Sequence, residues 1–115
     1  MIGLINGKEG DSLLVFKTAD ETILINCLSD LGVPLDITAD TVDLAFYDTE
    51  DRRNAVSLTL ATATITTALA GRATRTVLDT EMTLTPGSYF LFVKRTENVS
   101  STVEFSRKPT RVTVR

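Results

Sequence analysis

A turn-rich segment between two strand-like stretches places the strongest constraint on the fold of this chain. Leu28 to Thr38 contains an acidic Gly turn followed by Pro-Leu-Asp-Ile-Thr, and it joins the apolar stretch Thr22 to Leu28 to the alternating stretch Thr41 to Tyr47. In the second stretch the even-numbered residues are apolar and share one face, which is the period of two typical of a half-buried strand. Two such strands joined by a turn indicate antiparallel pairing, and therefore an all-β domain.

The same alternation, interrupted by turn residues, continues along the rest of the chain. It predicts about eight strands and no long helix. The segment from Ser88 to Lys94 is apolar on both faces, so we expect it at the centre of a sheet covered on both sides. One helical turn is expected from Asp79 to Leu84, capped by Asp79 or Thr80. The expected strands span Leu13 to Lys17, Thr22 to Leu28, Thr41 to Tyr47, Val56 to Ile65, Ala73 to Leu78, Ser88 to Lys94, Thr102 to Phe105 and Arg111 to Val114.

The longest stretch without a charged side chain runs from Asn54 to Gly71. Its apolar residues fall on even positions before Ala61 and on odd positions after it, and a bulge or tight turn would produce this shift. An uncharged run that does not alternate cleanly is hard to explain as solvent-facing sheet. The stretch from Ala61 to Ala70 is therefore either a surface for contact between copies, with Leu69 as the candidate contact residue, or an ordinary buried hairpin.

The length of 115 residues is that of one domain, spanning 1–115, and a hydrophobic content of 43% is sufficient for one core. The only cysteine, Cys27, lies in an apolar strand, where we expect a buried thiol that acts as a small hydrophobe. A chain without disulfides is compatible with folding in a reducing cytoplasm. The N-terminal sequence does not resemble a signal peptide, and no stretch has the composition of a membrane helix, so no membrane association is expected.

Charge is distributed unevenly along the chain. Residues 1–51 hold two basic and eleven acidic side chains, whereas residues 52–115 hold ten basic and four acidic ones, for a net charge of −3. Two explanations stay open: neutralisation within the fold, and charge-complementary contact with neighbouring copies or with a partner. A nucleic-acid interface needs clustered basic residues between exposed aromatic ones. The few basic residues from Arg107 to Arg115 do not meet this requirement, so we expect no nucleic-acid partner.

The residue types needed for catalysis are poorly represented. Histidine, the commonest general base and zinc ligand, does not occur. A pair of carboxylates would still suffice for a glycosidase, but the acids cluster in turns, where Asp bonds its own backbone. The turn acids at 36–43 and 48–51 have the oxygen chemistry that calcium prefers, yet their spacing matches no calcium loop. We therefore assign no catalytic, cofactor or metal residue and expect neither an enzyme nor a small-molecule substrate.

Two polar loops carry the other candidate residues for protein contact. One is the charged run that follows Tyr47, and the other is a predicted polar hairpin loop from Arg95 to Ser101. Tyr89, two residues after Gly87, is expected to be a corner tyrosine whose hydroxyl bonds nearby backbone. The other aromatic residues at 46, 47, 90 and 92 are expected in the core. The candidate contact residues in the loops are Asp48, Glu50, Asp51, Arg52, Arg53, Arg95, Glu97 and Asn98.

Several short motifs occur in a defined order over nearly the whole chain. They are Gly10-Asp11-Ser12, Leu28-Ser29-Asp30, Gly32, Pro34-Leu35-Asp36-Ile37-Thr38, Val42-Asp43-Leu44-Ala45-Phe46, Gly71, Pro86-Gly87-Ser88-Tyr89 and Val112-Thr113-Val114. Their order resembles that of the N-terminal immunoglobulin-like domain of phage baseplate upper proteins and of related small β-sandwich domains of tailed-phage virions. That family has a helix-like segment before the Pro-Gly, which Asp79 to Leu84 matches poorly.

The resemblance implies an immunoglobulin-like antiparallel β-sandwich and a non-enzymatic structural role in a phage virion. The protein would be a decoration, collar or baseplate/fibre adaptor protein, made in the host cytoplasm and incorporated into the particle. Its partners would be other virion proteins, through homo-oligomer or lattice contacts. The alternative is a carbohydrate- or cell-surface-binding module on a similar sandwich, against which the absence of Trp counts. A small intracellular adaptor is a third possibility.

Overall fold

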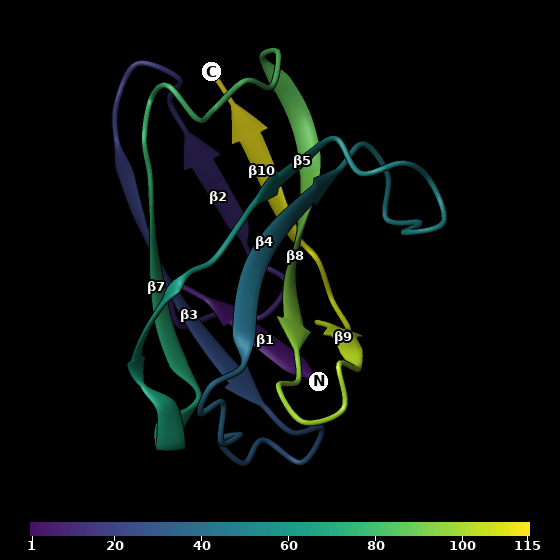
Figure 1. Ribbon diagram of the computed structural model, residues 1–115. Helices are drawn as coiled ribbons and strands as arrows, with labels where there is room; N and C mark the ends of the chain where they lie inside the picture. Colours follow the sequence, from purple (N-terminus) through teal and green to yellow (C-terminus); the bar gives the residue numbers. More distant parts are fainter.

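Ten strands form two sheets that pack against each other, as the computed structural model of residues 1–115 shows (Figure 1). The four-stranded sheet has the order β1-β3-β7-β6, and the six-stranded sheet has the order β2-β10-β8-β4-β5, with β9 also paired to β8. The expected all-β class is confirmed. The strands are β1 (Ile2–Ile5), β2 (Ser12–Val15), β3 (Glu21–Leu28), β4 (Thr41–Tyr47), β5 (Leu58–Leu60), β6 (Thr64–Thr67), β7 (Arg72–Val77), β8 (Gly87–Thr96), β9 (Val103–Phe105) and β10 (Thr110–Val114).

One strand pair departs from the antiparallel arrangement that the sequence predicted. β2 pairs with β10 in parallel, in the register Ser12 to Arg111, whereas every other pair is antiparallel. The chain changes sheets between β1 and β2, because β1 pairs with β3 in one sheet and β2 joins β10 in the other. The first strand, β1, was not expected from the sequence.

The shift in alternation near Ala61 marks a crossover between the two sheets. β5 belongs to the six-stranded sheet and β6 to the four-stranded sheet, so residues 61–63 carry the chain from one to the other. Thr62 adopts a φ of 55°, a left-handed conformation that β-branched residues rarely take. Its N–H donates to Oδ1 of Asp43 at 2.7 Å, and Ala63 N–H donates to the Val42 carbonyl at 2.7 Å. The bulge lies farther on, between Ile65 and Thr67.

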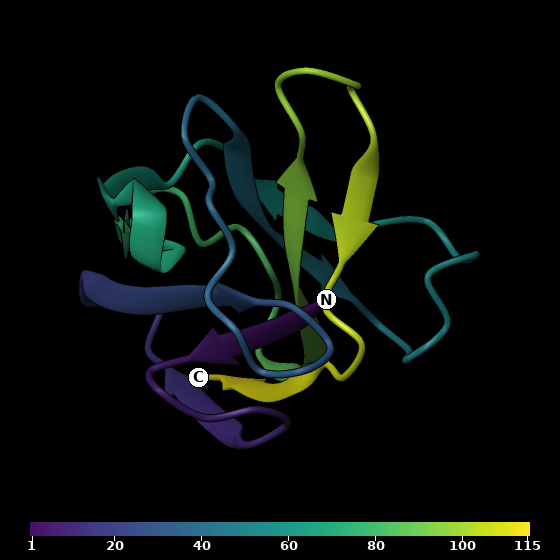
Figure 2. The same ribbon diagram turned by 90° about the horizontal axis from the view of Figure 1, so that it is seen from below.

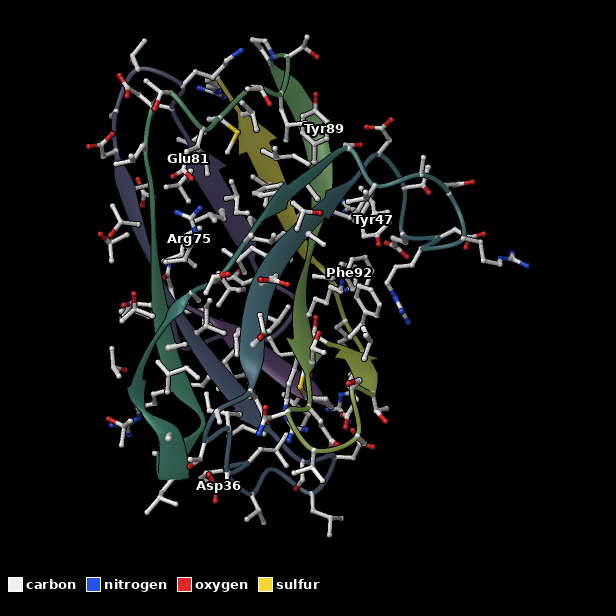
Figure 3. The ribbon with its side chains drawn as sticks, viewed as in Figure 1. Asp36, Tyr47, Arg75, Glu81, Tyr89 and Phe92 are labelled. Atoms are coloured by element: carbon white, nitrogen blue, oxygen red, sulfur yellow. The ribbon has the colours of Figure 1, made fainter.

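The main core lies between the sheets and contains 20 buried residues. β4 was expected to be half-buried, but this is wrong, because both of its faces are covered. Phe46 faces the main core, while Ala45 and Tyr47 pack with Phe92 of β8 in a second cluster on the outer face of the six-stranded sheet. The rings of Tyr47 and Phe92 meet edge to face at 5.6 Å between centroids (Figure 3). The central, largely buried position predicted for β8 is confirmed.

The predicted helical turn from Asp79 to Leu84 does not form, because the segment opens with one hydrogen-bonded turn, in which Glu81 N–H donates to the Leu78 carbonyl at 3.0 Å, and continues without a helix. The only helix is a 3-10 turn, η1 (Ala68–Ala70). Met82 and Leu84 are both buried in the core, and Thr83 N–H donates to the Glu81 carbonyl at 2.9 Å, which makes a tight turn at Met82 in place of a helix. No helix of the structure has the length and apolar character needed to cross a membrane.

Two predictions for single residues are confirmed. The Tyr89 hydroxyl donates to the carbonyl oxygen of Thr85 at 2.7 Å, across the turn that opens β8. Cys27 is fully buried, and burial raises the pKa of its thiol to about 11. A thiol with such a high pKa is a poor nucleophile at neutral pH, which agrees with its expected role as a small core residue.

Candidate interaction surfaces

Three loops meet at one end of the molecule, at the bottom of Figure 1 and facing the viewer in Figure 2. We call this the loop end; it comprises residues 29–40, 68–71 and 97–102. The first loop bonds to the second through Ile37 N–H and the Ala68 carbonyl at 3.0 Å. It bonds to the third through Asn98 N–H and Oδ1 of Asp40, also at 3.0 Å. The three loops therefore form one connected surface.

Arg95 stands beneath the loop end and is not the exposed contact residue that the sequence predicted. It is part of β8 and only 7% exposed. Its guanidinium donates to Asp40 at 2.8 Å and lies 3.3 Å from both Glu97 and Glu104. Burial opposes the charge of Arg95, but the hydrogen bond and charge of Asp40 outweigh it and raise the Arg95 pKa above its usual value. The prediction failed for two reasons. Asp40 is distant in the sequence, and the nearby partners Glu97 and Glu104 belong to a polar stretch whose sequence resembles an exposed loop.

Aliphatic side chains project from each loop of the loop end. Leu31 is 91% exposed, Val99 is 97% exposed and Leu69 is 75% exposed. Val33 is also exposed. The expectation that Leu69 lies on a contact surface is compatible with this exposure, whereas the alternative of an ordinary buried hairpin for residues 61–70 is wrong. Leu31 and Val99 were not recognised from the sequence, because an isolated aliphatic residue in a turn carries no periodic signal.

The loop end is acidic. Four carboxylates, those of Asp30, Asp36, Asp40 and Glu97, belong to it, and Glu104 of β9 lies beside it. They face one guanidinium, that of Arg95, and the N-terminal amine, which pairs with Asp30 at 2.8 Å. Asp36 has no cationic partner, and its pKa is held below the usual value by hydrogen bonds from the Thr38 hydroxyl and N–H. The surface therefore presents negative charge around the exposed aliphatic side chains.

The uncharged run Asn54 to Gly71 forms a continuous side of the molecule, which we call the uncharged side. It includes β5 and β6, the last strands of the two sheets, and the crossover between them. Most of its side chains are exposed, including Val56 and the threonines at 59, 62, 64, 66 and 67. Three charged side chains from outside the run bond to it. Asp48 accepts from the Ser57 hydroxyl and Asp43 accepts from the Thr62 N–H. Arg75, which is paired with Glu81, donates through Nε to the Ala61 carbonyl at 3.1 Å (Figure 3).

The charged loop after β4 lies away from the loop end, on the right of Figure 1. Asp51 pairs with Arg53 at 2.8 Å, and Asp48 accepts a hydrogen bond from the Ser57 hydroxyl. Glu50 is exposed and makes no ion pair, and Arg52 extends over the six-stranded sheet. The predicted contact residues therefore fall into two groups, with Glu97, Asn98 and Leu69 at the loop end and residues 48–53 elsewhere.

The outer face of the six-stranded sheet combines aromatic rings with cations that have no ion-pair partner. The Arg52 guanidinium lies 4.3 Å from the centre of the Phe105 ring and 5.3 Å from that of Phe92. Arg111 lies 5.9 Å from the centre of the Phe90 ring. Cations over aromatic faces gain a modest stabilisation. Sequence analysis did not identify this face, because its members come from three separate strands and one loop.

Asp36, Asp40, Asp43, Asp48 and Asp51 each make a hydrogen bond or ion pair within the chain. No three carboxylate or cysteine side chains lie close enough together to hold a metal ion. The sequence matches no protein-family model, and no curated protein shows significant similarity to it.

Proposed function

We propose that this protein is an immunoglobulin-like β-sandwich that acts by protein–protein contact, as a structural component of a tailed-phage virion. It would be a decoration, collar or baseplate/fibre adaptor protein and would contact other virion proteins or copies of itself. It would be made in the host cytoplasm and carried in the particle. The proposal assigns no catalytic step to the protein.

The strand order supports the immunoglobulin-like part of the proposal. Immunoglobulin sandwiches place strands A, B, E and D in one sheet and G, F and C in the other, with an added C′ in some types. The orders β1-β3-β7-β6 and β10-β8-β4-β5 follow the same pattern. Such folds also carry a tyrosine near the start of strand F that bonds backbone a few residues upstream. Tyr89 near the start of β8 has this position and this bond.

The exposed uncharged side is the observation that carries the contact function. Edge strands of sheets are normally protected by charged side chains, because unprotected edges pair with other chains. Here both sheets end in one uncharged run that leaves Leu69 and Val56 exposed to solvent. A surface of this kind is expected to be covered in the functional assembly.

Sedimentation of the protein from a lysate of its natural source tests this proposal. We expect the wild type to sediment with large particles and to remain bound at moderate salt. Leu69→Asp is expected to abolish sedimentation without unfolding the protein, since the side chain is exposed. Leu78→Asp changes another exposed leucine, in the turn that follows β7, and is expected to sediment like the wild type. A wild type that stays in the soluble fraction would contradict the virion role.

The aromatic outer face of the six-stranded sheet favours a second candidate, a carbohydrate- or cell-surface-binding module. Sugars stack on aromatic rings, and Phe90 and Phe105 are only partly buried there. Arg52 covers Phe105, however, and would have to move before a sugar ring could stack on it. A glycan screen without hits up to about 1 mM, the weak end of specific affinities, would remove this candidate.

A further inference from the structure

Two surfaces of the molecule carry charge of opposite sign. The loop end is acidic and carries protruding aliphatic tips. The outer face of the six-stranded sheet is basic and contains a hollow. The uneven charge of the sequence is thus only partly neutralised inside the fold, by pairs such as Arg107 with Glu9 and Arg95 with Asp40.

The basic character of the outer face comes from three cations, Arg52, Lys94 and Arg111. Lys94 pairs in register with Phe105 and follows Val93, which faces the main core, so its side chain lies on the outer face. None of the three makes an ion pair within the chain, unlike Arg53, Arg75, Arg95 and Arg107. The charges of Arg52 and Arg111 therefore remain available to a partner, whereas Lys94 lies opposite Asp43 of β4 on the same face.

The hollow on this face has a volume of about 410 Å³. Ser12, Ser88, Phe90, Arg111 and Thr113 line it from strands β2, β8 and β10. The hollow therefore presents the Phe90 ring beside the Arg111 guanidinium, together with the hydroxyl groups of its serine and threonine residues. Small apolar side chains that protrude from an acidic surface match these features.

We propose that the acidic loop end of one copy docks on the basic outer face of the six-stranded sheet of the next copy. Val99 or Leu31 would enter the hollow, and Asp36 and its acidic neighbours would face Arg111 at its margin. The inference rests on the proposed function, because both state that the protein acts through protein–protein contacts. It goes further by naming the partner as a second copy and by locating both halves of the contact.

The two halves of this contact are different surfaces, so the contact is heterologous. Ser88 and Phe90 lie in the first half of β8, whereas the other end of β8 leads into the loop end. Each copy therefore offers a docking end and, toward its opposite end, a free receiving face. Heterologous contacts extend into open rows or close into rings, and they do not stop at a two-fold dimer. The charge contribution is expected to weaken as salt screens it.

Sedimentation velocity of the purified full chain tests the inference. We expect concentration-dependent association at about 50 mM salt and loss of association at about 500 mM, where screening is much stronger. Asp36→Lys removes the docking end and Arg111→Glu removes the receiving face, and each is expected to weaken association at least about tenfold. Glu21→Lys reverses a charge of the other sheet at the start of β3, the end away from the loop end, and is expected to leave association unchanged.

An equimolar mixture of the two variants distinguishes this contact from contacts in which a loop end meets a loop end or a face meets a face. Arg111→Glu keeps a working loop end and Asp36→Lys keeps a working face, so the mixture is expected to form one-to-one dimers and nothing larger. Circular dichroism checks that each variant is folded. Val99→Ser changes a fully exposed side chain and is expected to weaken association several-fold. A mixture that stays monomeric overturns the inference. A wild type that is monomeric at about 1 mM protein and low salt also overturns the inference. That result would not contradict the proposed function, which the sedimentation of the protein with large particles tests separately.

Discussion

Arg95 and Asp40 are separated by 55 residues, yet the guanidinium Nε of Arg95 donates a 2.8 Å hydrogen bond to Oδ2 of Asp40. Both side chains are nearly inaccessible to solvent. The other oxygen of Asp40 accepts the N–H of Asn98, so this one carboxylate joins the loop before β4 to the loop after β8. The pair is therefore the main polar connection that fixes two of the three loops of the loop end.

We expect Arg95→Met to destabilise the protein by about 3 kcal/mol, since removing one partner of a buried pair leaves the other charge unpaired. Asp40, Glu97 and Glu104 would then repel one another without a cation between them. Arg95→Lys keeps the charge but loses the planar fork, and it is expected to cost less. Urea unfolding measures both free energies, and amide exchange in residues 36–40 and 97–102 reports the loosening of the loops. An unfolding free energy of Arg95→Met equal to that of the wild type would contradict this account.

The features that the sequence predicted correctly depend on neighbouring residues. The alternation in β4 is enough to predict a strand, and the hydrogen bond from the Tyr89 hydroxyl to the Thr85 carbonyl spans only four residues. Both could therefore be predicted without knowledge of the fold. The burial of Arg95 was not, because Asp40 lies far away in the chain. The crossover at Thr62 was visible only as a shift of phase, which a bulge within one sheet would produce equally well.

The candidate surfaces were harder to predict than the strands. Leu69 was identified from the absence of charge around it, a property of the local sequence. The grouping of Leu31, Val99 and four carboxylates at one end results from the way three loops meet, which no local pattern records. The two loops proposed as contact sites lie apart for the same reason.

Gly71 joins η1 to β7 at a point where no side chain fits. Its φ is +67°, and a Cβ atom there would lie 2.3 Å from the carbonyl oxygen of Cys27 and 3.0 Å from that of Leu35. Backbone atoms of β3 and of the loop before β4 cannot move aside as a flexible side chain would. We expect Gly71→Ala to destabilise the protein by about 3 kcal/mol or more, combining left-handed strain with overpacking.

Gly32→Ala is the matched control for Gly71→Ala. Gly32 also has a positive φ, of +80°, but a Cβ atom there would meet nothing within 4 Å. Only the conformational strain applies, so we expect a loss of about 1 kcal/mol. Thermal and urea unfolding of the two variants separate steric clash from backbone strain. Equal losses in both would show that the close approach to Cys27 contributes nothing.

Tyr89→Phe is expected to lower the free energy of unfolding by about 1–2 kcal/mol, because it leaves a partly buried carbonyl without its donor. The hydroxyl of Tyr89 bonds the Thr85 carbonyl and lies 3.1 Å from the Thr85 hydroxyl. Tyr47→Phe makes the same chemical change at a buried tyrosine whose hydroxyl has no hydrogen bond within the chain, and we expect little effect. Urea unfolding with unchanged m-values tests the difference, and an equal effect at the two positions would contradict the role of the corner bond.

Glu81 makes stability depend on pH in the acidic range. Hydrogen bonds from the Arg75 guanidinium and the Leu78 N–H lower its pKa from 4.5 to about 2 in the folded protein. Between these values the unfolded chain binds a proton that the folded chain does not. Stability from this group is therefore fully present above pH 4.5 and is lost as the pH falls through about 2.

Glu81→Gln isolates this contribution from that of the other carboxylates. We expect the variant to unfold at a lower temperature than the wild type at pH 7, and the difference between them to narrow as the pH falls from 4.5 toward 2. Glu50→Gln, at an exposed carboxylate without an ion pair, is expected to follow the wild type at every pH. Thermal unfolding followed by circular dichroism measures the midpoints. A difference between Glu81→Gln and wild type that stays constant down to pH 2 would show that the stabilisation by Glu81 does not come from its ionised form.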